Sequence, residues 1–157
     1  VEVTQGAGGD FKTALSEVKD SIAEYPSAQA FLLKGVLLEK TEPGEAMTSY
    51  RLGLDKATSG TATEALLRRN IGLMLAKQVD WDGAYSHFKR YVDRCEAESK
   101  PMSDSEHAFW GLLLHRRGDE AQARQAWAVT RVAIMTTPKT ISAGVAKASH
   151  GEVARVN

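Results

Sequence analysis

One pattern occurs three times along this chain of 157 residues and constrains its fold more than any single residue does. Each copy has a glycine, an alanine eleven or twelve positions later, and an aromatic residue four positions after the alanine. Chains built from such units stack them, and their usual product is a binding surface. The copies are Gly35, Ala46 and Tyr50; Gly72, Ala84 and Phe88; Gly111, Ala123 and Trp127; and a partial copy with Ala14, Val18 and Pro26.

The spacing inside each copy is helical. Residues four apart lie on one face of a helix, so the alanine and the aromatic residue share a face. The glycine lies on the preceding predicted helix, where glycine costs about 1 kcal/mol relative to alanine. Three glycines at matching places indicate a shared cause. We expect that cause to be close approach of the two helices, with the aromatic residue covering the joint and reaching the next unit.

Turn and cap signals divide the chain into helices. Ser103 and Glu106 have the spacing of a capping box, and Gly118 suits the left-handed residue that ends a helix. Strand signals are scarce, because β-branched residues do not alternate over any long stretch. We therefore predict an all-α protein, with helices over residues 10–25, 27–40, 43–57, 62–77, 80–98, 103–116 and 119–135.

These features resemble the tetratricopeptide repeat, a helix–turn–helix unit of 34 residues. The resemblance covers residues 10–136 and implies a right-handed solenoid of helical hairpins, with about three repeats and a half repeat at the N-terminus. The copies diverge from the family, with extra residues at 57–61 and 98–102. The last copy matches best, through Trp110, Gly111, Leu114, Gly118, Ala123 and Trp127.

The regions outside the array have a different composition. Residues 1–9 contain a glycine-rich stretch and are predicted to be a linker remnant. Residues 137–157 contain no aromatic residue and are predicted to be a tail or a capping helix. The helix that should pair with residues 10–25 is missing, which fits either a piece of a longer protein or a mature chain after processing, and we favour the first explanation.

Catalysis finds little support in the motifs. No HExxH, CxxC, Gly-x-Ser-x-Gly or phosphate-loop pattern occurs. His107 and His115 are eight residues apart, so on a helix they lie about 12 Å apart, too far for one metal ion. We expect no enzymatic activity, no cofactor and no metal.

Charge and hydropathy narrow the class of partner. The net charge is zero, with 20 basic and 20 acidic residues, so the basic pairs at 68–69, 89–90 and 116–117 do not indicate a nucleic-acid surface. No apolar run reaches the 18 or more residues of a membrane span. We expect a soluble protein without a membrane span, and a cytoplasmic location is favoured over a periplasmic one.

The resemblance implies that the first helix of each hairpin lines a concave groove that binds a partner protein. We expect a scaffold or adaptor that docks a peptide or an amphipathic helix there, with affinity from apolar residues and selectivity from Arg69, Asn70, Lys77 and Arg116. Of the polar residues that grip a C-terminal carboxylate in one subset of the family, only Asn70 is matched here. By position, the groove residues are Leu32, Val36, Glu39, Arg69, Asn70, Leu73, Lys77, Leu112, His115 and Arg116.

Two other roles remain open. The array could assemble into a larger complex through its ends. Residues 1–60 carry 9 acidic and 6 basic side chains, whereas residues 115–157 carry 3 and 7, a polarity that suits head-to-tail self-association. The chain could instead be a regulatory module of a longer protein.

Overall fold

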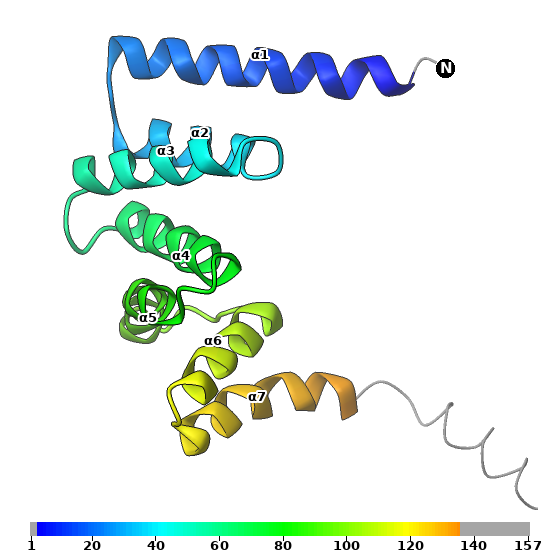
Figure 1. Ribbon diagram of the computed structural model, residues 1–157, viewed down its shortest axis with the longest axis vertical. Coiled ribbons are helices and arrows are strands. Elements are labelled where there is room, and N and C mark those ends of the chain that lie inside the picture. Colours follow the sequence, from blue (N-terminus) through cyan, green and yellow to red (C-terminus); the bar gives the residue numbers. More distant parts are fainter. Residues whose placement is uncertain (1–2, 136–157) are drawn as a thin grey trace, which may run out of the picture. The chain divides into compact units, whose positions relative to one another are not determined.

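The computed structural model describes the backbone of residues 3–135 and the side chains of residues 9–130 (Figure 1). All regular structure in this range is helical, so the all-α prediction is confirmed. The expected tail or capping helix at 137–157 lies outside the described residues. The helices are α1 (Val3–Glu24), α2 (Ala28–Leu38), α3 (Pro43–Lys56), α4 (Ala62–Lys77), α5 (Trp81–Ala97), α6 (Asp104–Arg116) and α7 (Glu120–Met135).

The helix starts follow the cap signals of the sequence. The hydroxyl oxygens of Ser27 and Thr61 accept hydrogen bonds from backbone amides in the first turns of α2 and α4. At α6 the capping box is complete, because Ser103 Oγ accepts from the Glu106 amide at 3.3 Å and Glu106 Oε2 accepts from the Ser103 amide at 2.8 Å. Each cap satisfies amides that have no partner inside the helix.

Two features at the helix ends differ from expectation. Helix α1 begins at Val3 rather than at residue 10, so residues 3–9, expected to belong to a linker, are helical. Gly118 has the left-handed backbone predicted for it, with φ at 84°. Val79 and Ser99 adopt the same conformation after α4 and α5, with φ at 64° and 52°. Neither is glycine, so composition offered no signal for these two turns.

The chain divides into two compact units, residues 1–102 and 103–157. In the first unit, α2 pairs with α3 and α4 pairs with α5 as hairpins. Helix α1 contacts α2, and α4 contacts both α2 and α3. Its most deeply buried large side chains are Tyr50, Leu67, Ile71 and Phe88. The second unit is the hairpin of α6 and α7, which buries Leu113 and Ala123 completely. Whether the two units continue one array, as predicted for residues 10–136, stays a prediction.

The repeated glycines lie at close contacts, as predicted, but the contacts are of two kinds. At Gly72 a side-chain Cβ would lie 3.1 Å from the carbonyl oxygen of Ala84, so there the two backbones approach closely. At Gly35 and Gly111 the neighbour is instead the ring of Tyr50 or Trp127 from the second helix of the same hairpin. The aromatic residue of these two copies therefore fills the space that a glycine side chain would need.

Candidate functional site

Helix α2 exposes part of the predicted groove. Val36 is 50 % exposed and Leu32 is half-buried. Leu33, which the sequence analysis did not select, is 49 % exposed. It precedes Val36 by three positions, so the two side chains are neighbours on the helix surface. The buried side of α2 is formed by Phe31, Gly35 and Leu38. Leu33 is apolar but lies outside this buried stripe, and that was the signal by which the sequence could have revealed its exposure.

Helix α4, which contacts α2, contributes similar residues. Leu73 and Lys77 are two of the predicted groove residues. Leu73 is half-buried and Lys77 is exposed. Leu66, again not selected from the sequence, is 37 % exposed and lies two turns before Leu73 on the same side of the helix. We call the exposed parts of these two helices the α2–α4 face; it comprises Leu32, Leu33, Val36, Leu66, Leu73 and Lys77.

Three predicted groove residues serve a different purpose. Glu39, Arg69 and Asn70 gather around the fully buried Tyr50. The Tyr50 hydroxyl donates to Glu39 Oε1 at 3.0 Å, and Arg69 Nη1 donates to Asn70 Oδ1 at 2.9 Å. The Arg69 guanidinium also lies over the ring of Tyr91, 5.8 Å from its centroid. We call these five residues the Tyr50 cluster; it connects α2, α3, α4 and α5.

The pKa of Tyr50 reflects the burial of the Tyr50 cluster. Burial is the main cause of a raised Tyr50 pKa, and the hydrogen bond to Glu39 raises it further, while Asn70 and Arg69 act in the opposite direction. Asn70 is 7 % exposed. Its side-chain amide thus contacts Tyr50 of another helix, and its expected part in selecting a partner stays a prediction. The cluster fixes how the α2–α3 hairpin meets α4.

The second unit holds the other three predicted residues. Leu112 is half-buried, whereas His115 and Arg116 are exposed at the end of α6. His115 Nδ1 lies 2.6 Å from Glu120 Oε1, and its ring packs against that of Trp127, with centroids 5.8 Å apart. Trp127 in turn donates from its indole nitrogen to the Ala108 carbonyl at 3.1 Å. His115 therefore ties α6 to α7 within this hairpin.

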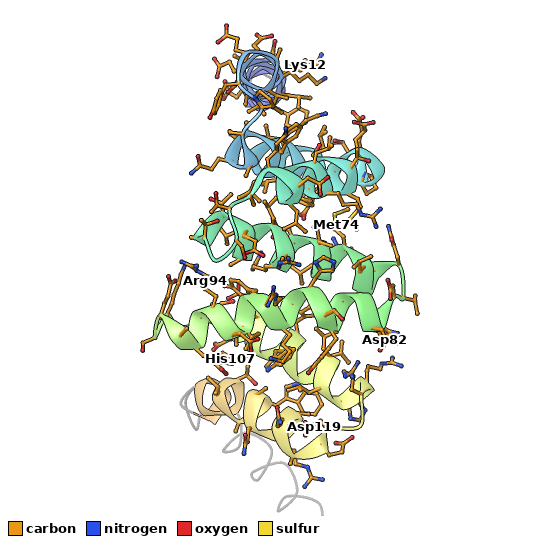
Figure 2. The ribbon with its side chains drawn as sticks, turned by 90° about the vertical axis from the view of Figure 1, so that its left-hand side faces the viewer. Lys12, Met74, Asp82, Arg94, His107 and Asp119 are labelled. Atoms are coloured by element: carbon orange, nitrogen blue, oxygen red, sulfur yellow. The ribbon has the colours of Figure 1, made fainter. Side chains whose placement is uncertain are left out.

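A cavity that the sequence analysis missed lies elsewhere in the first unit. Its volume is about 460 Å³, and it is formed by the 59–61 loop, the start of α4 and the C-terminal part of α5. Arg94, one of its residues, lies near the end of α5 opposite to Asp82 (Figure 2). Three arginines line the cavity, namely Arg68, Arg90 and Arg94. The basic pairs at 68–69 and 89–90 were the only sequence signal for it.

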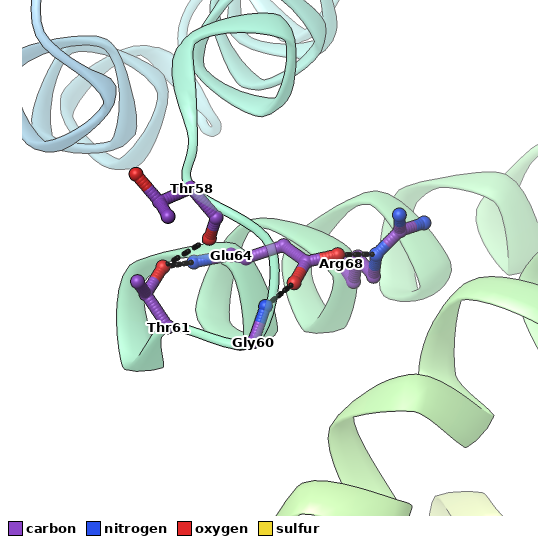
Figure 3. A network of polar contacts seen from close by, with 5 residues as sticks. All are labelled: Thr58, Gly60, Thr61, Glu64 and Arg68. Atoms are coloured by element: carbon purple, nitrogen blue, oxygen red, sulfur yellow. Dashed lines mark hydrogen bonds and ion pairs between the residues drawn. The ribbon is translucent and has the colours of Figure 1, made fainter.

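One wall of the cavity is a hydrogen-bonded network (Figure 3). Glu64 accepts from the Gly60 amide at 2.6 Å and from Arg68 Nε at 2.7 Å. Thr61 Oγ1 donates to the Thr58 carbonyl at 2.7 Å and accepts from the Glu64 amide. The Arg68 hydrogen bond is the main cause of a lowered Glu64 pKa, so this carboxylate stays ionised at neutral pH. The network holds the loop against the first turns of α4.

Comparisons with known proteins do not assign the chain to a family. No protein-family model matches the chain, and no curated protein is significantly similar to it. Among the described residues, no group of three or more histidine, cysteine or acidic side chains is placed to hold a metal ion. None of the helices in the described range combines the length and the apolar character needed to cross a bilayer.

Proposed function

We propose that the chain is a tetratricopeptide-like protein-interaction module that acts without catalysis, as a scaffold or adaptor. The repeated hairpins support this proposal, because all three have a glycine on the first helix and an alanine and an aromatic residue on the second. Stacked hairpins of this kind form right-handed solenoids that offer an extended surface for binding rather than a deep catalytic pocket. In the proposed role, the first helices of the hairpins receive the partner.

The observation that carries the proposal is the apolar character of the α2–α4 face. Leu33, Val36 and Leu66 are 49 %, 50 % and 37 % exposed on two helices that contact each other. Leu33 and Val36 are neighbours on α2, and exposed apolar residues that adjoin one another are typical of interaction sites, whereas single ones are ordinary. Lys77 adds a positive charge on α4. The partner that fits best is an amphipathic helix with an apolar stripe and acidic residues beside it.

Site-specific photocrosslinking tests this proposal. A photoreactive amino acid is placed at Val36 in the whole chain, and a second version carries it at Leu52, which is 43 % exposed on α3. We expect one partner protein to crosslink at Val36 and not at Leu52. Adding Leu33→Lys and Leu66→Lys should abolish that crosslink, while Leu52→Lys should leave it unchanged. The Leu33→Lys and Leu66→Lys variant and the Leu52→Lys variant both replace partly exposed side chains. The thermal stability of each variant should therefore remain close to that of wild type.

Equal crosslinking at both positions, or a crosslink that survives Leu33→Lys and Leu66→Lys, would contradict the proposed face. Crosslinking of the chain to itself would favour the structural alternative, in which copies assemble through their ends. The charge polarity between residues 1–60 and 115–157 supports that alternative. It predicts a molar mass by light scattering that increases with protein concentration and decreases with added salt.

A further inference from the structure

The charged residues that line the cavity at the start of α4 balance one another, and Lys89, just outside it, adds one positive charge. Three arginines and three carboxylates line it. Glu64 is held by Arg68, and Glu98 pairs with Arg94. Asp93 accepts two hydrogen bonds from Lys89, at 2.7 and 2.8 Å, and Lys89 is not one of the lining residues. With Asp93 paired to Lys89, Arg90 is the lining cation that has no ion pair among the described residues.

Arg90 differs from its neighbours in forming no ion pair, although its charge acts on Glu64 across the cavity. Its side chain is exposed, and neither a hydrogen bond nor an ion pair to it occurs among the residues that the structure describes. Arg94, which pairs with Glu98 through its Nη2, also has a buried Nε without an acceptor. Arginine offers donors in a planar fork that matches carboxylate and phosphate oxygens. These two guanidinium groups, four residues apart on α5, are thus positioned to share an anionic group.

The size and the lining of the cavity indicate what else the ligand carries. A volume of about 460 Å³ falls within the range typical of small-molecule sites and exceeds what a single carboxylate or phosphate group needs. Ala65 and Ala97 contribute methyl groups to its walls. An apolar body of modest size would therefore be in contact with protein carbon atoms while its charged group faced the arginines.

We propose that this cavity binds a small organic anion, with one carboxylate or phosphate group held by Arg90 and Arg94 and an apolar body against Ala65 and Ala97. The site goes beyond the proposed protein-binding role, because its lining residues are different from those of the α2–α4 face. It gives the first unit a second binding site, formed by the 59–61 loop and the open end of the α4–α5 hairpin.

Titration of the whole chain with phenyl phosphate tests the inference. Binding is followed by ¹H–¹⁵N spectra and calorimetry, with inorganic phosphate and phenol as probes that carry only the anion or only the ring. We expect saturable shifts at the Gly60 amide and at the amides of residues 90–97, and weaker binding of the two partial probes. Arg90→Gln should weaken phenyl phosphate binding roughly tenfold, since it removes a charge-assisted hydrogen bond.

Two further variants make the result specific. Lys19→Gln removes the same charge from α1, which contacts neither α4 nor α5, and should leave the affinity unchanged. Asp93→Asn removes a negative charge from the cavity wall and should tighten binding. The inference is overturned if phenyl phosphate does not saturate, if its shifts lie away from the cavity, or if Arg90→Gln and Lys19→Gln bind it equally well.

Discussion

Gly35 lies under the ring of Tyr50, and a Cβ at this position would overlap that ring. Tyr50 is completely buried and its hydroxyl is held by Glu39, so the ring cannot move aside without loss of other contacts. We expect Gly35→Ala to lower the free energy of unfolding by about 1–3 kcal/mol, the usual cost of overpacking. Chemical denaturation of both proteins measures this difference in stability, provided that the m-value is unchanged.

Gly44 supplies the matched control for Gly35. It also lies in a helix, α3, but no atom comes within 4 Å of where its Cβ would be. Gly44→Ala should therefore be neutral or stabilise by about 0.5–1 kcal/mol, because alanine loses less backbone entropy on folding. If both variants shifted the denaturation midpoint in the same direction, steric contact with Tyr50 would not explain the glycine.

His87 makes the stability of the first unit depend on pH. Its Nδ1 is buried without a hydrogen-bond partner. Burial is the main cause of a lowered His87 pKa, and the charges of Arg68 and Arg51 lower it further, while Asp80 acts in the opposite direction. A histidine whose pKa is lower in the folded state than in the unfolded state contributes stability above the unfolded pKa. That stability is lost as the pH falls through the folded pKa.

The stability of wild type should thus decrease from pH 7.5 to pH 5 more steeply than that of His87→Gln, which does not titrate. The window begins near the ordinary histidine pKa of 6.5 and extends below it. Urea denaturation of both proteins at several pH values gives the two curves, and their difference at pH 7.5 measures the packing change alone. Parallel curves over this range would show that His87 has the same pKa in the folded state as in the unfolded state.

At the scale of helices, the sequence predicted nearly everything that depends on local signals. All seven helices of the described range were expected, and α4 begins and ends at the predicted residues. Caps and turns are decided within a few residues, so they can be recognised in a linear pattern. The roles of Glu39, Arg69 and Asn70 could not be recognised in this way. They depend on Tyr50 of α3, whereas Glu39 follows α2 and the other two residues lie on α4.

The same limit applies to the candidate sites. Leu33 and Leu66 were missed because family positions, rather than exposure, selected the groove residues. The cavity was missed because its lining combines a loop, the start of α4 and the end of α5, which come together only in the folded hairpin. Periodicity reports which face of a helix is apolar, but not which helix covers that face.

The Tyr50 cluster makes a prediction about how two hairpins are held together. Tyr50→Phe removes the hydroxyl with which a fully buried side chain donates a hydrogen bond to Glu39. We expect a loss of about 1–2 kcal/mol in the free energy of unfolding. Tyr25→Phe is the control, since Tyr25 is 76 % exposed and should change stability little. Similar denaturation midpoints for the two variants would remove the cluster as a source of stability.

At the scale of the molecule, three similar copies of one pattern are distributed over two compact units. The boundary follows residues 98–102, where the sequence has extra residues and Pro101. Each unit packs its own aromatic residue on its own glycine, Tyr50 on Gly35 in the first and Trp127 on Gly111 in the second. Local contacts of this kind stabilise the unit that contains them, and regions of different stability open separately in the native state.

Hydrogen exchange should therefore report damage unit by unit. Gly111→Ala forces a Cβ against the Trp127 ring, and we expect faster exchange throughout α6 and the N-terminal half of α7, with changes below roughly twofold in α4 and α5. Gly35→Ala should produce the reverse distribution, and Gly44→Ala should accelerate neither unit. Mass spectrometry of peptides from the whole chain measures all three. If Gly111→Ala accelerated α4 and α5 as strongly as α6, the two units would unfold as one, because only energetic coupling carries the loss of a contact from one hairpin to another.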